Sequence, residues 1–196
     1  MSNLELNKGD NFIICADVSM SMGTKDCGSM SRIEYMKEQL RTFATQASEW
    51  DEDGIDLITF GENVKVNANI AGDKAIEIIN GLKASEASTD TAGAIRAAYK
   101  RHKDTGSAQT FCMLFTDGEP NDRAAVKKAI VSISKELKDE HEFAISFITV
   151  GKIEAKLQSF LTELDDDLKE AAYDIVDVKK IEEVDFVAAC AGALHD

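Results

Sequence analysis

Apolar residues along the chain alternate between continuous runs and helical spacing. The runs at 12–16 and 110–116 are apolar almost throughout, as expected for strands buried on both faces of a parallel sheet. Val64 and Val66 alternate with polar residues after a tight turn, which predicts a short antiparallel edge strand. Further strands are expected at 55–60, 143–150 and, more weakly, 173–178.

Between these strands, apolar residues recur three or four positions apart, the pattern of a helix with one buried face. Asn121 stands where its side chain can cap the helix that follows the 110–116 strand. The predicted helices are 33–47, 73–83, 91–102, one after Asn121 that carries Val126 to Leu137, 153–164, and a last one with Ile181, Val184, Val187, Ala188 and Ala191 on one face.

The alternation of strands and helices predicts an α/β fold, with a doubly wound, mostly parallel sheet and helices on both faces. The chain has no internal repeat and no linker, so one domain is expected to fill residues 1–196, with a core at about 10–194. In such sheets, ligands bind at the carboxyl ends of the strands, where the winding reverses direction. That rule directs attention to Asp17 and Asp117, which end the two most buried strands.

Three polar stretches supply candidate chemistry at that edge of the sheet: 17–21 (Asp-Val-Ser-Met-Ser), 88–93 (Ser-Thr-Asp-Thr-Ala-Gly) and 116–120 (Thr-Asp-Gly-Glu-Pro). Two buried carboxylates side by side repel each other, and a divalent cation resolves that conflict. Hydroxyl and carboxylate oxygens are hard donors that favour Mg²⁺, with Mn²⁺ or Ca²⁺ as alternatives, over zinc or copper. Neutral hydroxyls leave such an ion able to bind one more anion.

The set Asp17-x-Ser19-x-Ser21, Thr89 and Asp117 resembles the metal-ion-dependent adhesion site (MIDAS) of von Willebrand factor A-type domains. The resemblance extends over nearly the whole chain and implies a six-stranded sheet of order 3-2-1-4-5-6, with strand 3 short and antiparallel at the edge. It also implies that Ser19 and Ser21 coordinate the ion directly, and that Thr89 does so when a ligand is engaged. Asp17 and Asp117 are expected to act largely through bound waters.

By the same resemblance, the remaining coordination position takes a Glu or Asp carboxylate of a partner protein. Met20, Gly118 and Glu119 flank the ligand positions and are candidate partner contacts. Thr91 is an alternative to Thr89, which is preferred because the family's metal threonine comes first in its Thr-x-Thr stretch. The loop from Gly23 to Ser31 extends the motif, and it is expected either to shape partner choice or to be ordinary loop variation.

The composition of the chain narrows the classes of ligand and the cellular locations that are expected. The formal net charge of −14 argues against binding nucleic acid or anionic lipid, because both need a basic surface. No apolar stretch approaches the roughly 20 residues that span a membrane, and the first ten residues do not resemble a secretory signal. The four cysteines form no zinc pattern, and Cys15 and Cys112 are expected to be buried. A cytoplasmic location is therefore expected, with which a viral or phage source is compatible; the oligomeric state is left open.

Other functions have weaker support. One is a structural or assembly subunit whose metal site is vestigial or only stabilising. Another is a metal-assisted phosphohydrolase, although Ser19 stands where dehalogenase-like phosphatases carry a second aspartate, and no catalytic residue is predicted. The remaining features are expected to be structural: exposed histidines at 102, 141 and 195, a solvated acidic run at 165–167, and a packing role for Trp50.

Overall fold

A computed structural model describes residues 10–47 and 54–184. In it the chain forms one six-stranded sheet in the order β3-β2-β1-β4-β5-β6. The β2–β3 pair is antiparallel and every other neighbouring pair is parallel, which confirms the predicted α/β topology. The strands are β1 (Asn11–Asp17), β2 (Ile55–Phe60), β3 (Val64–Ile70), β4 (Thr110–Thr116), β5 (Phe143–Thr149) and β6 (Val176–Lys180).

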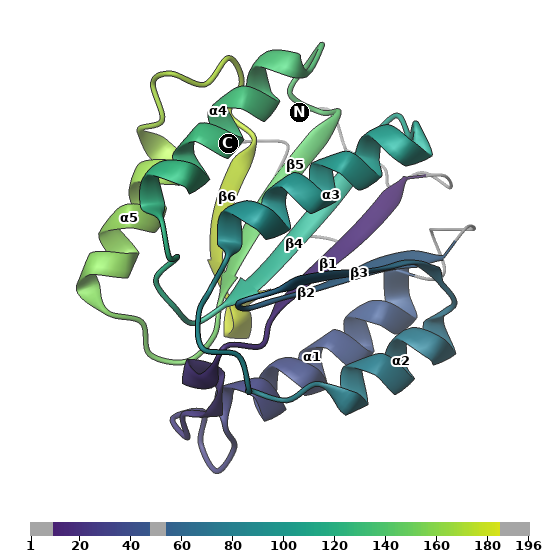
Figure 1. Cartoon of the computed structure of the whole chain (residues 1–196), viewed down its shortest axis with the longest axis vertical. Helices are drawn as coiled ribbons and strands as arrows, with labels where there is room; N and C mark the ends of the chain where they lie inside the picture. Colours follow the sequence, from purple (N-terminus) through teal and green to yellow (C-terminus); the bar gives the residue numbers. More distant parts are fainter. Residues whose placement is uncertain (1–9, 48–53, 185–196) are drawn as a thin grey trace.

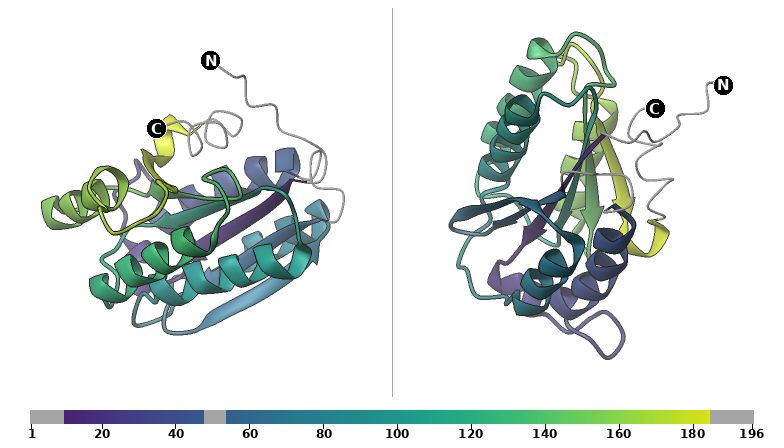
Figure 2. Two further views of the ribbon diagram at one scale, coloured as in Figure 1. Left: turned by 90° about the horizontal axis from the view of Figure 1, so that it is seen from above. Right: turned by 90° about the vertical axis from the view of Figure 1, so that its right-hand side faces the viewer.

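Two layers of helix cover the two faces of the sheet (Figures 1 and 2). One layer holds α1 (Arg32–Ala47) and α2 (Gly72–Gly81), and the other holds α3 (Thr91–Thr105), α4 (Arg123–Glu136) and α5 (Ala155–Asp166). Short 3-10 helices, η1 (Met20–Gly23) and η2 (Ile181–Glu183), follow β1 and β6. Among the described residues, no helix combines the length and apolar character needed to cross a membrane.

The central strands are buried because both of their faces are covered. Every residue of β1, β4 and β5 is buried, whereas β3 at the sheet edge is only half-buried or exposed. Alternate β1 residues serve the two cores: Ile14 packs with the α1–α2 layer, and Ile13 packs with α3, α4 and α5. Continuous apolar runs therefore mark the strands that carry the site at their ends.

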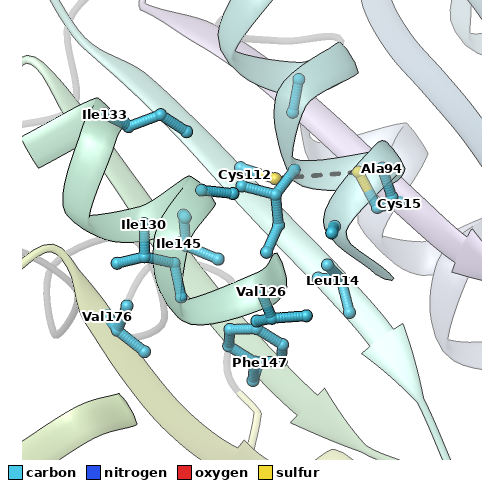
Figure 3. Close-up of a cluster of buried hydrophobic side chains, with 14 of the residues drawn as sticks. Cys15, Ala94, Cys112, Leu114, Val126, Ile130, Ile133, Ile145, Phe147 and Val176 are labelled. Atoms are coloured by element: carbon cyan, nitrogen blue, oxygen red, sulfur yellow. Dashed lines mark hydrogen bonds between the residues drawn. The ribbon is translucent and has the colours of Figure 1, made fainter. Parts of the chain in front are cut away.

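The cysteines of β1 and β4 are buried, as predicted, and they lie in the core between the sheet and the α3–α5 layer. Figure 3 shows Cys15 and Cys112 among its apolar side chains, with their sulfur atoms 3.7 Å apart. Both are free thiols, and the hydrogen bond with Cys112, together with burial, raises the pKa of Cys15 well above its ordinary value. The pair fills space in the core as neutral, apolar side chains.

Three structural predictions were wrong in detail. The cap of α4 is Asp122, whose carboxylate accepts a hydrogen bond from the Ala125 N–H, and Asn121 has another role described below. The sixth strand begins at Val176, later than predicted, after the turn that contains Tyr173. His102 and His141 are half-buried rather than exposed: His102 is stacked on Tyr99, and its Nδ1 lies 2.9 Å from the Thr110 hydroxyl.

Other expectations have mixed outcomes. The acidic run at 165–167 spans the end of α5, where its second and third residues are exposed. After β6 the chain forms η2 at the start of the predicted last helix, and the rest of that helix lies outside the described residues. Trp50 and His195 also lie outside them.

Candidate metal centre

The loop after β1 is held in place by backbone hydrogen bonds at the carboxyl edge of the sheet. The Val18 N–H donates to the carbonyl of Phe60 at 2.8 Å, and the Met20 N–H donates to the carbonyl of Glu86 at 2.8 Å. In Figure 1 the arrowheads of the parallel strands point toward the short dark purple helix after β1, which is η1. These bonds fix the Asp-x-Ser-x-Ser segment between β2 and the loop before α3.

Ser19, Ser21 and Asp117 form a continuous hydrogen-bonded chain. The hydroxyl of Ser21 donates to Asp117 Oδ1 at 2.7 Å, and the Ser19 and Ser21 oxygens lie 3.0 Å apart. A hydroxyl has one hydrogen, so Ser21, which donates to Asp117, can only accept in its contact with Ser19. Two residues spaced by two thus present their oxygens to one point beside β4.

Asp17 is fully buried at the end of β1. Its Oδ1 accepts from the Ser19 N–H at 2.8 Å, and its Oδ2 accepts from the Thr116 hydroxyl at 2.6 Å. Burial raises the pKa of this carboxyl to about 6, and the charge of Asp117 adds to the rise, whereas the hydrogen bonds from Ser19 and Thr116 oppose it. Without a cation beside it, the Asp17 carboxylate is therefore under-compensated.

Thr89 reaches the same place from the loop before α3. Its N–H donates to Asn121 Oδ1 at 2.8 Å, and its carbonyl accepts from the Asn121 N–H at 3.0 Å. A Cβ on Gly118 would lie 3.5 Å from Ser21 Oγ and 3.8 Å from Thr89 Oγ1, so both hydroxyls lie against this glycine. Asn121, expected to be a helix cap, instead fixes the Thr89 loop to the loop after β4.

Thr91, the alternative ligand, lies in the first turn of α3. It is buried, and its hydroxyl has no hydrogen-bond partner among the described residues. The intervening Asp90 caps the helix, because its carboxylate accepts from the Gly93 N–H at 2.8 Å. The two threonines are thus separated by the start of the helix, and Thr89 is the one beside Ser21.

Sequence reasoning missed Arg32, a cation built into this edge of the sheet. Its Nη1 donates to Asp117 Oδ2 at 2.8 Å, and the side chain of Asp117 has no exposed surface. Its Nε and Nη2 bind the two oxygens of Asp26 at 2.9 and 2.6 Å. These contacts raise the pKa of Arg32 and lower that of Asp26 to about 2.

The Arg32 network also closes the 23–31 loop. Arg32 donates to the carbonyl of Lys152 at 2.8 Å, and the Lys152 N–H donates to Asp26 Oδ2 at 3.1 Å. The loop after β5 is therefore tied to the extended loop after η1. The only sequence signal was a lone arginine at the start of a helix, which has many ordinary explanations.

The assembled groups suit a hard cation. Three hydroxyls and two carboxylates meet beside a hollow of about 380 Å³, lined by Ser21, Arg32, Thr89, Asp117, Gly118, Glu119, Lys152, Glu154 and Leu157. Within the described ranges, no three His, Cys, Asp or Glu side chains gather as a metal cluster, so any ion here depends on hydroxyl ligands. Such a donor set favours Mg²⁺, Mn²⁺ or Ca²⁺ over a thiolate or imidazole metal.

Two of the candidate partner contacts, Gly118 and Glu119, line this hollow, and the third, Met20, lies between the two serines in the chain. Met20 is 61% exposed, which is unusual for a large apolar side chain in this molecule. Glu119 is half-exposed and forms an ion pair with Arg123 at 2.8 Å, and Gly118 is half-buried beside Ser21. An apolar and an acidic side chain therefore stand beside the hydroxyl groups.

Comparison with known proteins agrees with the topology. Residues 12–120 match the von Willebrand factor type A domain. The chain belongs to this family. A Borreliella burgdorferi protein described as uncharacterized is 25% identical to this A-type domain over 162 residues, which cover 80% of the chain and 46% of the relative. The chain therefore spans less than half of that relative's length.

Solved structures show the same fold at low sequence identity. The manganese-loaded TRAP protein of Plasmodium vivax superposes with a TM-score of 0.68 and 16% identity, over 97% of this A-type domain and 75% of that chain. Proximal thread matrix protein 1 from the mussel byssus, with a zinc-occupied MIDAS motif, gives a TM-score of 0.58 and 14% identity over 95% of this chain and 46% of its own. These likenesses establish the architecture.

Proposed function

We propose that this A-type domain is a protein-binding module that uses one divalent cation to bind an acidic side chain of a partner. Ser19, Ser21 and Thr89 would coordinate the ion directly, and Asp17 and Asp117 would act largely through water. The ion would supply a Lewis-acidic position for a Glu or Asp carboxylate. The observation that carries this proposal is the meeting of hydroxyls from two loops with two buried aspartates at one edge of the sheet.

Charge supports the proposal as well as geometry. Arg32 compensates Asp117, whereas Asp17 accepts hydrogen bonds from neutral groups of Ser19 and Thr116, and burial holds its pKa at about 6. A divalent cation would stabilise the ionised form of Asp17. At this edge of the sheet, Asp117 thus has a built-in counter-ion, and no cation of the described residues pairs with Asp17.

We propose Mg²⁺ as the native ion, with Mn²⁺ or Ca²⁺ as alternatives, because the ligands are hard oxygens. The manganese and zinc in the names of the two structural relatives support a divalent cation in this fold. Met20, Gly118 and Glu119 would surround the carboxylate of the partner. A cytoplasmic location and a single domain over 1–196 stay predictions, as does the absence of enzymatic activity.

Arg32 favours a second candidate function. Its guanidinium already binds Asp117 and joins two loops, so it serves part of the role of a metal ion. In a structural subunit, that arrangement would stabilise the edge of the sheet, and any bound metal would add only stability. The two candidates differ in whether partner binding requires the ion.

The decisive experiment measures metal binding and partner binding separately. Isothermal titration with MgCl₂ and MnCl₂ should show one site in the parent chain, and Ser21→Ala and Thr89→Ala should lose it. Ser159→Ala, which removes an exposed hydroxyl from α5, is the matched control. At about 100 times its dissociation constant, the ion should add roughly 2.7 kcal/mol to the free energy of unfolding.

Partner capture from the native source should then be compared in Mg²⁺ and in chelator. Loss of capture in chelator and in Thr89→Ala supports the binding module. Metal binding without any effect on capture favours the structural subunit. Absence of metal binding at millimolar concentration, with Ser159→Ala and the parent behaving alike, would refute the metal-dependent function.

A further inference from the structure

The helix layer of α3 and α4 carries a positive charge that contrasts with the acidic chain. The whole chain has 36 acidic residues against 22 Lys and Arg, a net charge of −14. In α3 and α4 the balance reverses, because Asp104 and Glu136 are their only acidic residues. Their basic residues are Arg96, Lys100, Arg101, Lys103, Arg123, Lys127, Lys128 and Lys135.

Four of these basic residues border one groove between the two helices. The groove has a volume of about 460 Å³ and is lined by Arg96, Tyr99, Lys100, Lys103, Lys128, Ala129, Ser132, Ile133 and Glu136. Its floor is Tyr99, Ala129 and Ile133, and the four cationic side chains are exposed around it. We call this surface the basic groove.

Two of the four cations in the basic groove have no acidic partner within the described part of the chain. Arg96 and Lys128 form no ion pair there. Lys100 pairs with Asp104 on its own helix at 2.5 Å, and Lys103 spans the groove to Glu136 at 3.3 Å. Lys103 also lies 4.5 Å above the centre of the Tyr99 ring. The groove therefore combines uncompensated positive charge with an aromatic and aliphatic floor.

We propose that the basic groove is a second binding surface, which takes a short acidic segment of another protein that offers an apolar side chain between its carboxylates. The cations would bind the carboxylates, while their aliphatic stems and the floor would contact the apolar side chain. The surface is separate from the metal centre: Arg96 to Lys103 lie about 8 to 18 Å along α3 from its first residue.

The charge of the whole chain selects a short acidic peptide over a longer polyanion. Electrostatic attraction is screened beyond about 8 to 10 Å, so a short segment responds mainly to the local cations. A nucleic acid or an anionic membrane extends farther and would meet the acidic remainder of the surface. An apolar floor also offers nothing to a phosphate backbone. A second copy of this acidic chain would be repelled.

The test uses a fluorescent peptide made of glutamate and leucine, with leucines at helical spacing and about 15 residues long, near the length at which isolated helices form. Binding is measured by anisotropy in chelator, so that the metal centre cannot contribute. The variant Arg96→Glu/Lys128→Glu reverses two unpaired cations. Lys65→Glu/Lys83→Glu makes the same change in net charge on β3 and after α2, away from the groove.

The parent and the Lys65→Glu/Lys83→Glu control should bind the peptide equally well, and Arg96→Glu/Lys128→Glu should bind at least about tenfold more weakly. A peptide with glutamine in place of glutamate, or alanine in place of leucine, should also bind more weakly. Unchanged melting temperatures show that the variants fold. Persistence of binding in chelator distinguishes this surface from the metal-dependent function, whose failure would leave these results unchanged.

Three outcomes overturn the proposal. The first is no binding of the glutamate–leucine peptide at millimolar concentration. The second is an equal loss of binding in the groove variant and the control, which would mean that only net charge matters. The third is tighter binding of single-stranded DNA or phosphatidylserine vesicles than of the peptide, lost in the groove variant, which would assign the groove to those ligands.

Discussion

At the carboxyl edge of the sheet, charged side chains are buried and hydrogen-bonded to one another, whereas in the basic groove they stand in solvent. Asp117 has no exposed side-chain surface and is bound by both Arg32 and Ser21. Lys103 and Glu136 form an ion pair of 3.3 Å, longer than the 2.8 Å between Arg32 and Asp117, and each side chain is more than half exposed.

The difference teaches what each region can do. Buried charges interact in a low dielectric, so their pKa values shift and the loss of one partner is costly. Exposed charges are screened by water and salt, contribute little to folding, and stay available to a partner. The first region is built to hold one ion in one geometry, and the second to attract a ligand without a fixed geometry.

Replacement of Arg32 is expected to have the largest effect. Arg32→Ala removes the counter-ion of two carboxylates, the buried Asp117 and the largely buried Asp26. The free energy of unfolding should therefore fall by about 3 to 5 kcal/mol. Urea denaturation in chelator measures this loss. Mg²⁺ should restore part of it, because the ion would also compensate Asp117.

Arg41→Ala is the matched control on the same helix. Arg41 donates to Asn80 Oδ1 at 3.0 Å in an exposed contact, so its removal should have little effect. Equal destabilisation by the two substitutions would remove the distinction between the buried and the exposed region.

The second prediction concerns pH. The pKa of Asp17 is about 6 in the folded chain against an ordinary value of 3.8, so between these values the folded state holds a proton that the unfolded chain has lost. Stability in chelator should therefore decrease as pH rises from about 4 to 7, by up to about 3 kcal/mol from this group. Mg²⁺ should reduce the decrease, because it favours the ionised carboxylate.

Asp17→Asn provides the comparison for this measurement. The variant lacks the titrating group, so its free energy of unfolding should change less over the same pH range. Asp26, whose pKa is lowered to about 2, stabilises the fold above pH 3.8 and loses that contribution only in stronger acid, outside this window. Parallel pH profiles for the parent and Asp17→Asn would contradict the role assigned to Asp17.

The smallest effect is expected in the basic groove. Lys103→Ala removes an exposed ion pair with Glu136 and a contact with Tyr99, so the free energy of unfolding should fall by at most about 1 kcal/mol. Added salt should shrink this difference but leave most of the Arg32→Ala effect. A salt-independent loss in Lys103→Ala would show that the groove is part of the rigid core.

Much of the fold was predictable because burial on both faces leaves a clear pattern. The runs in β1 and β4 and the helical spacing of α4 reflect contact with the core, and the predicted sheet order is confirmed. The errors occur where two neighbouring residues could each make the same local contact. Asn121 and Asp122 are both good caps, and only the position of Thr89 shows that Asn121 serves a loop instead.

The sequence by itself determined the strands, the helices and the α/β class, because burial leaves a local pattern along the chain. The sheet order and the five candidate ligands followed from the resemblance to A-type domains, which the Asp-x-Ser-x-Ser spacing, Thr89 and Asp117 carry. Tertiary structure alone decided that Arg32 binds Asp117 across 85 positions, and that cations from α3 and α4 border a single groove. The physical reason is the range of the interactions. Periodicity records which side of an element meets the core, whereas a charge pair depends on where two distant side chains end up.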